Sequence, residues 1–296
     1  MATEIEVDSE EMQPETAYSN LKTLTTGAFG KILLMRAKTG NVQYAAKVMN
    51  VDPGSVLQKA ARNEMNALFR LQHENIIFVK EMFVCRSGNA VWIVMELADW
   101  GNLEDHMRTS GPLSDERLTS YVSQLSRCME FVHSNQYSHG DVTPRNLLLF
   151  SSGLLKLTDF GQSLHCPRDE QPVSVAEIIG DPRYLAPEIL RGSKYYPQAA
   201  DVWSTGCCVY FMFTCKHLYQ GNENDIKRCQ MKGQVFYPGE RFYQNKYAKM
   251  REIVSRLTRY DPVSRPAFGQ WSVSGLASYV EEILCTSSRM CFDESA

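Results

Sequence analysis

The chain carries two polar segments: His139-Gly140-Asp141-Val142-Thr143-Pro144-Arg145-Asn146 and, after a short apolar run, Thr158-Asp159-Phe160-Gly161. The carboxylate of Asp141 can accept a proton from an attacking hydroxyl group. Asn146 and Asp159 carry amide and carboxylate oxygens, which are the ligands that Mg²⁺ prefers. Because apolar runs flank these groups, we expect Asp141 and Asn146 on a loop after a helix, and Asp159 directly after a short strand.

The order of these groups resembles the catalytic centre of protein kinases, in which they serve phosphoryl transfer from ATP. The resemblance covers residues 21 to about 284. It implies an α+β fold of two lobes, the two-lobed protein kinase fold. The β-rich N-lobe is expected over residues 21–97 and the larger helical C-lobe over residues 98–285, with a C-terminal tail over residues 286–296.

Composition favours a protein of the cytoplasm or nucleus that spans no membrane. Residues 1–20 hold six acidic and no basic residues, the reverse of a signal peptide, and predict a disordered acidic tail. No apolar run approaches the roughly 20 residues of a membrane helix. The net charge of -3 gives no bulk attraction to nucleic acid or an anionic membrane. The nine cysteines show no Cys-x-x-Cys spacing, which favours reduced thiols.

The pattern of apolar residues changes near residue 98. Before it, short β-rich runs surround one helical segment, which places Leu57, Ala61, Glu64 and Leu68 on one face. After it, helical periodicity predicts four long segments: Ser114–Ser134, Ala199–Phe213, Tyr247–Leu257 and Trp271–Leu284.

The segment from Leu24 to Ile32 resembles the kinase glycine-rich loop, with Thr25 in place of the first glycine. The resemblance implies that Lys47 contacts the phosphates of ATP and forms an ion pair with Glu64. Read singly, the glycine stretch is equally consistent with a hairpin turn, and Lys47 or Glu64 alone is more consistent with an exposed charge. The residues that the resemblance assigns to ATP binding are Leu24, Thr25, Thr26, Gly27, Ala28, Phe29, Gly30, Ile32, Ala45, Lys47, Glu96, Ala98 and Leu148.

Three positions depart from the family pattern. Gly140 replaces an arginine that pairs with a phosphorylated loop in many kinases, so activation by loop phosphorylation is not expected. Thr143 replaces a lysine that serves the transferring phosphate, and we expect Arg145 to take over as charge stabiliser. Asp181 replaces a threonine, and we expect the Thr143 hydroxyl to donate to it. Without such a donor, repulsion between Asp181 and Asp141 would raise the pKa of a carboxyl group.

The segment Gly180–Glu188 resembles the part of protein kinases that docks the substrate peptide. The resemblance implies an ion pair of Glu188 with Arg265, hydrogen bonds from the 139–146 loop to Asp201, and packing of His139 on Phe160. The form of the segment favours Ser or Thr acceptors. Asn102 and Arg145 stand where basic-directed kinases carry acidic residues, so substrates that are not strongly basic are expected.

The leading interpretation is therefore a protein serine/threonine kinase that uses ATP and Mg²⁺, acts on protein substrates and is a monomer. Its catalytic residues would be Asp141, Lys47, Arg145 and Glu64, and its metal ligands Asn146 and Asp159. Two alternatives remain. One is a weak pseudokinase that acts as a scaffold, suggested by Thr25, Gly140, Thr143 and Asp181. The other is a small-molecule phosphotransferase, since some of these also use His-Gly-Asp with a following Asn.

Overall fold

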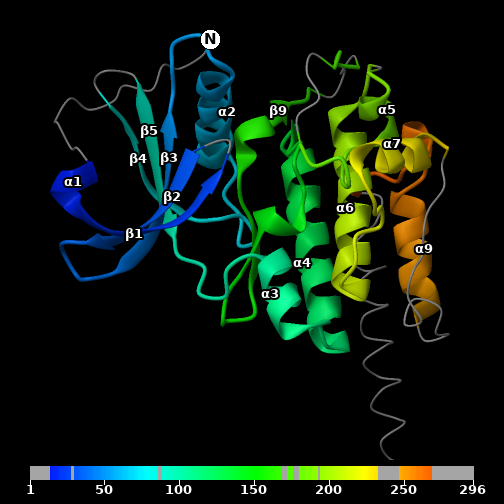
Figure 1. Cartoon of the computed structure of the whole chain (residues 1–296), viewed down its shortest axis with the longest axis horizontal. Helices are drawn as coiled ribbons and strands as arrows, with labels where there is room; N and C mark the ends of the chain where they lie inside the picture. Colours follow the sequence, from blue (N-terminus) through cyan, green and yellow to red (C-terminus); the bar gives the residue numbers. More distant parts are fainter. Residues whose placement is uncertain are drawn as a thin grey trace, which may run out of the picture. The chain divides into compact units, whose positions relative to one another are not determined.

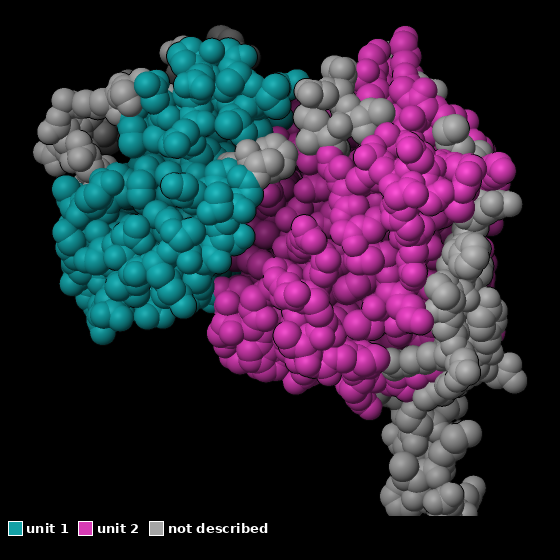
Figure 2. All heavy atoms as spheres, in the orientation of Figure 1, with its two compact units in different colours: residues 1–65, 78–97 teal, residues 66–77, 98–296 magenta. Residues whose placement is uncertain are grey.

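The computed structural model describes residues 14–27, 30–85, 89–167, 172–175, 180–192, 194–232 and 247–268. The chain divides into two compact units, coloured separately in Figure 2. Unit 1 comprises residues 1–65 and 78–97, and unit 2 comprises residues 66–77 and 98–296. Each unit is described by itself below.

Unit 1 is built on an antiparallel sheet of five strands in the order β1-β2-β3-β5-β4. The strands are β1 (Tyr18–Gly27), β2 (Gly30–Ala37), β3 (Gln43–Asn50), β4 (Val79–Val84) and β5 (Ala90–Glu96). Two helices complete the set, α1 (Pro14–Ala17) and α2 (Val56–Arg70), the second of which continues into unit 2. The β-rich character predicted for this part of the chain is confirmed.

The first strand begins earlier than the composition predicts. Tyr18 is 4% exposed, and its ring contacts the edges of Tyr44 and Phe83 at centroid distances of 5.9 and 6.5 Å. Burial, with the nearby Glu81 carboxylate, raises the pKa of Tyr18 to about 12. Packing of this one aromatic ring outweighs the acidic composition around it. The predicted disordered tail is therefore wrong for residues 14–20, while residues 1–13 lie outside the described part.

Unit 2 is mainly helical. Its helices are α3 (Leu103–Ser110), α4 (Asp115–Ser134), α5 (Pro187–Leu190), α6 (Pro197–Thr214), α7 (Glu223–Met231) and α9 (Ala248–Leu257). Helix α6 packs against both α4 and α9 (Figure 1) and is buried along most of its length, as expected for a helix that is apolar on all sides. Three of the four predicted helices are confirmed to within two residues. The fourth, at residues 271–284, lies outside the described residues, as does the predicted tail at 286–296.

Two small two-stranded sheets place the loops of unit 2. Strand β6 (Tyr137–Ser138) pairs with β9 (Leu164–His165), and β7 (Leu147–Leu149) pairs with β8 (Leu155–Leu157). Short 3₁₀ turns accompany them: η1 (Pro144–Asn146), η2 (Phe160–Gln162) and, near the end of the unit, η4 (Pro262–Ser264). The β7–β8 pair brings the end of the 139–146 loop to the start of the 158–161 segment. None of the described helices is long and apolar enough to cross a membrane.

Candidate active site

The 139–146 loop is anchored through the buried carboxylate of Asp201 on α6. The backbone N–H groups of His139 and Gly140 donate to its two oxygens at 2.7 and 2.8 Å. The Nε2 atom of His133, at the end of α4, lies 3.0 Å from the same carboxylate. These contacts confirm the predicted hydrogen bonds between the loop and Asp201, and they fix the backbone that carries Asp141.

Asn146 holds the side chain of Asp141 in place. Its Nδ2 atom donates at 2.8 Å both to the backbone carbonyl and to Oδ2 of Asp141. Both protons of the amide are therefore used, and no described donor reaches its Oδ1 atom. That oxygen is left as a potential metal ligand.

Asp159 lies beside Asn146 because the backbone N–H of Thr158 donates to the Asn146 carbonyl at 3.0 Å. Asp159 has φ 64°, a left-handed conformation that is uncommon for a residue other than glycine. The described residues contain no cluster of three or more His, Cys, Asp or Glu side chains suited to a metal. Mg²⁺ does not require one, because it binds through one or two carboxylates plus substrate phosphates and water. Oxygens from Asp159 and Asn146 fit this ion.

His139 is a structural residue, as the sequence predicts. Its ring meets Phe160 edge to face at 4.6 Å and is fully buried. Its Nδ1 atom accepts the backbone N–H of Asp141 at 3.1 Å, which leaves the proton on Nε2 to donate to the Thr158 carbonyl at 3.0 Å. Both ring nitrogens are thus engaged in holding Asp141 and the 158–161 segment together.

Gly140 is required by the backbone. Its φ is +82°, and a Cβ atom there would lie 2.6 Å from the backbone oxygen of Gln162 in η2. Any other residue would be strained by both the dihedral angle and the contact. The departure at Gly140 therefore has a local conformational cause, which is the close approach of η2 to the loop.

Unit 1 contains the predicted ion pair. The Nζ atom of Lys47 on β3 lies 2.7 Å from a carboxylate oxygen of Glu64 on α2, and both side chains are buried. Burial of such a pair requires tight mutual neutralisation, which the short contact supplies. The exposed-charge alternative for these two residues is wrong.

In the glycine-rich segment, the fold requires a glycine at position 30 but not at position 27. A Cβ atom at Gly30 would lie 2.1 Å from the Val48 carbonyl, so β3 excludes any side chain there. A Cβ atom at Gly27 would meet nothing within 4 Å. Leu24, Thr25 and Thr26 are exposed on β1. Ala28 and Phe29 lie outside the described residues.

The remaining residues assigned to ATP binding fall in both units. Ala45 is buried and Ile32 half-buried in the sheet of unit 1. Glu96 ends β5, where its side chain accepts the backbone N–H of Phe78 at 2.7 Å. In unit 2, Leu148 is half-buried on β7, and the backbone N–H of Ala98 donates to no described residue. A backbone donor of this kind is what recognition of an adenine edge requires.

The predicted pair between Glu188 and Arg265 is confirmed. Two guanidinium nitrogens of Arg265 donate to the two carboxylate oxygens at 2.6 and 2.8 Å, and both side chains are buried. Arg265 also donates to the carbonyl of Ala199 at 2.9 Å. The pair fixes α5, and with it the end of the 180–188 segment, to the start of α6.

Residues 18–274 match the family model described as protein kinase domain, which accounts for most of the chain. The chain belongs to the protein kinase family. This kinase domain contains the predicted combination of a five-stranded sheet unit and a helical unit, so the α+β kinase fold is confirmed.

Similar curated proteins are kinases from different organisms. The kinase domain is 29% identical over 258 residues to "Probable serine/threonine-protein kinase nek3" of Dictyostelium discoideum, covering 84% of this chain and 22% of that protein. It is 33% identical over 196 residues to CBL-interacting protein kinase 9 of Oryza sativa subsp. japonica, covering 64% and 42%. It is 31% identical over 210 residues to cyclin-dependent kinase-like 2 of Homo sapiens, covering 70% and 41%. The chain thus spans less than half the length of these three relatives.

Arg145 of the kinase domain is held by a partner that the sequence does not predict. Its Nε and Nη2 atoms donate to the two carboxylate oxygens of Glu104 on α3, at 2.8 and 3.3 Å. Hydrogen bonding to Glu104 raises the pKa of the guanidinium. The Nη1 atom has no described partner, and two thirds of the side chain is exposed.

The predicted hydrogen bond from Thr143 to Asp181 is wrong. The Asp181 carboxylate accepts instead from the backbone N–H of Arg183 at 3.0 Å and from its guanidinium, with Nε 2.9 Å from each oxygen. Burial raises the pKa of Asp181, but the hydrogen bonds and charge of Arg183 outweigh it and leave the pKa below its usual value. The predicted repulsion is therefore relieved by Arg183.

Three residues of this region were missed by sequence reasoning: Glu104, Arg183 and His217. Glu104 lies 41 positions from Arg145, and no local pattern links the two. Arg183 stands two positions after Asp181, in the segment that resembles the peptide-docking part of protein kinases. This short spacing could have indicated an ion pair between the two residues. His217 follows α6 with no recognisable motif around it.

Proposed function

We propose that this kinase domain is an active serine/threonine protein kinase that uses ATP and Mg²⁺. The proposal is carried by the hydrogen-bonded arrangement of Asp141, Asn146 and Asp159. Asn146 orients the Asp141 carboxylate through Nδ2 and presents Oδ1, while the Thr158 backbone places Asp159 next to it. A proton acceptor and two metal ligands are thereby held together on the loops that flank the β7–β8 pair.

In the proposed reaction, each residue has a separate task. Asp141 accepts the proton of the substrate hydroxyl, and its contact with Asn146 keeps one carboxylate oxygen in a fixed direction. Asn146 and Asp159 hold Mg²⁺, which neutralises the charge on the phosphates. Lys47, oriented by Glu64, binds the phosphates of ATP. Gly27, which the fold does not require to be a glycine, is proposed to lie against the phosphates.

Arg145 is proposed as the charge stabiliser in place of the missing lysine. Its free Nη1 atom can reach a phosphate oxygen while Nε and Nη2 remain on Glu104. The neighbouring Arg183 is already neutralised by Asp181. Because the acidic groups here are paired with arginines of the chain itself, we propose Ser or Thr substrates that are not strongly basic.

The cysteines bear on the compartment in which the protein works. None of the seven described cysteines forms a disulfide. We propose that the protein works in the cytoplasm or nucleus, where thiols stay reduced.

The test is transfer of labelled phosphate from ATP and Mg²⁺ to an arrayed Ser/Thr/Tyr peptide library. Asp159→Asn is a suitable blank, because asparagine tolerates the left-handed conformation while it removes the charge. We expect incorporation on Ser and Thr peptides well above this blank. No signal above the blank would refute the proposal and favour a pseudokinase scaffold, whereas transfer to a small molecule alone would favour the third interpretation.

A further inference from the structure

A histidine outside the proposed catalytic residues lies at the end of a chain of contacts that leads back to Asp141. His217 follows α6 and stacks on Phe211, with ring centroids 5.1 Å apart and an interplanar angle of 25°. Its ring also meets the ring of Tyr184 edge to face at 5.9 Å. Two aromatic contacts therefore fix the plane of the imidazole.

The hydrogen bonds of His217 define which nitrogen carries the proton. Nη1 of Arg183 lies 2.5 Å from Nε2, and because a guanidinium can only donate, Nε2 must accept. The ring is then neutral, with its proton on Nδ1, which donates to the Tyr184 hydroxyl oxygen at 2.8 Å. Burial and the adjacent Arg183 lower the pKa of His217, which agrees with a neutral ring.

Arg183 connects His217 to Asp181. One side of the guanidinium donates to both oxygens of Asp181, and Nη1 on the other side donates to His217. Hydrogen bonds therefore hold the guanidinium from both sides. If His217 were absent, Nη1 would lose its acceptor and the guanidinium would be held from one side only. The rotamer of Arg183, and the position of the carboxylate that it neutralises, depend on this second contact.

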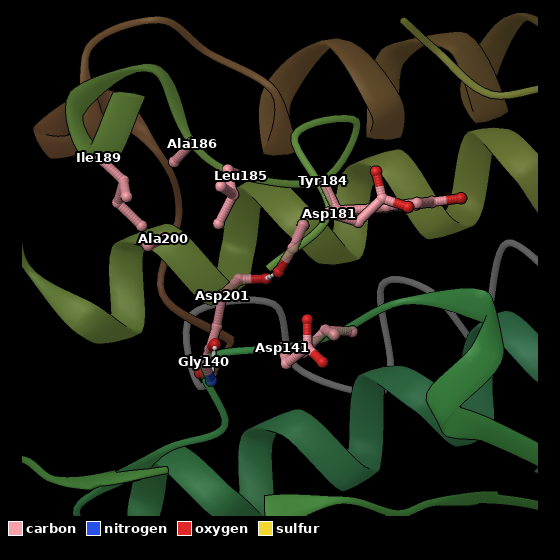
Figure 3. A pocket seen from close by; sticks show the side chains of 11 residues that line it. Gly140, Asp141, Asp181, Tyr184, Leu185, Ala186, Ile189, Ala200 and Asp201 are labelled. Carbon is pink, nitrogen blue, oxygen red and sulfur yellow. Dashed lines mark hydrogen bonds between the residues drawn. The ribbon is translucent and has the colours of Figure 1, made fainter. Parts of the chain in front are cut away.

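Asp181 lies next to the proposed base. It lines the same small pocket as Asp141, from a different segment of the chain (Figure 3). The preceding residue is Gly180, where an added Cβ atom would be 3.6 Å from Oδ1 of Asp141. A shift of the Asp181 segment would therefore move groups that lie close to the base.

We propose that His217 is a positioning residue for phosphoryl transfer, holding Arg183 on Asp181 and thereby fixing the segment that borders Asp141. The inference rests on the proposed kinase activity. His217 acts only as a neutral ring, since a proton on Nε2 would remove the acceptor and place a second cation against Arg183. The other charged groups that face it are Asp181, Glu104 and Arg145.

Two variants separate hydrogen bonding from packing. His217→Phe keeps an aromatic ring against Phe211 and Tyr184 but offers no acceptor to Arg183. We expect it to lower kcat roughly tenfold, which is about 1.4 kcal/mol, with the KM for ATP unchanged. His217→Gln supplies an uncharged acceptor and donor, and we expect it to recover most of the turnover lost in His217→Phe. His106, which stacks on Trp100 in another part of unit 2, provides the control variant His106→Gln, expected to keep normal kcat.

A spectroscopic measurement tests the same inference without activity. In wild-type protein labelled with ¹⁵N-histidine, the signal that disappears in His217→Gln should report protonated Nδ1 and unprotonated Nε2 at neutral pH. A ring protonated on Nε2 would overturn the inference alone, as would unchanged kcat in His217→Phe. A wild-type protein no more active than Asp159→Asn would instead overturn the proposed function. The catalytic role of His217 would fall with it, even if the spectrum still showed the proton on Nδ1.

Discussion

Replacing Gly140 with alanine is expected to destabilise unit 2 by about 2–5 kcal/mol, as the sum of two separate effects. The left-handed φ of +82° costs an L-residue about 1–2 kcal/mol. The new Cβ atom would also lie 2.6 Å from the backbone oxygen of Gln162, and forcing such a contact apart costs about 1–3 kcal/mol more.

Gly101 provides a matched control in the same unit. Its φ is +68°, but a Cβ atom there would meet nothing within 4 Å. Gly101→Ala should therefore show the dihedral cost of about 1–2 kcal/mol without the steric one. The entropy that alanine removes from the unfolded chain is similar in both variants and cancels in the comparison.

The assay is urea unfolding, monitored by a spectroscopic signal from unit 2. The midpoints of the three proteins are compared where the dependence of the free energy of unfolding on urea concentration has the same slope. We expect Gly140→Ala to unfold at the lowest urea concentration, wild type at the highest, and Gly101→Ala between them. Equal losses for the two variants would refute the argument that η2 excludes a side chain at Gly140. The departure from the family pattern would then need another cause.

Three further predictions concern charged groups. Lys47→Ala should cost about 3–5 kcal/mol of stability in thermal unfolding, because it removes the cation beside the buried Glu64; the double variant with Glu64→Ala should cost less than the sum of the single changes. Arg145→Ala should lower kcat about 100-fold if its guanidinium stabilises charge, whereas Glu104→Gln, which frees that guanidinium, should alter kcat far less; full turnover of a peptide by Arg145→Ala would contradict the role. Acidification should destabilise unit 2, because burial and the adjacent guanidinium lower the pKa of His217 in the folded state. As the pH falls, His217 becomes protonated in the unfolded chain before it does in the folded one. Its contribution to the free energy of unfolding is therefore present above about pH 6.5 and lost as the pH falls through the folded pKa. Urea titrations should show a smaller loss of stability on acidification in His217→Gln.

The sequence predicts the sheet unit, three helices and the buried ion pairs. Each of them follows from the pattern of apolar residues along the chain or from the need of a buried charge for an opposite charge. A buried charge must find a partner, so placing Lys47 on a core strand and Glu64 on the inner face of a helix leaves little choice. The apolar run of α6 has to be covered on all sides, which fixes it at the centre of unit 2. Tyr18 is the exception, since a single ring within an acidic segment gives no periodic signal.

Half-exposed charges could not be paired from the sequence in the same way. Arg145 can reach several acids at little difference in energy, and its contact with Glu104 depends on where α3 begins relative to the loop. For Asp181, the resemblance suggested Thr143 as the partner, whereas the structure pairs it with Arg183. The choice of Arg183 reflects the acceptor that His217 offers on its far side, and His217 is placed only by the turn after α6.

These outcomes change how the departures from the family pattern weigh on catalysis. Gly140 follows from a backbone contact with Gln162 and says nothing about turnover. Asp181, which would harm a neighbouring base if left alone, is neutralised by Arg183. Thr143 is the remaining loss, because no described contact gives its hydroxyl the task of a lysine. The Nη1 atom of Arg145 is the one group proposed to replace that lysine, since Glu104 already holds the other two nitrogens, and the turnover of Arg145→Ala tests this role.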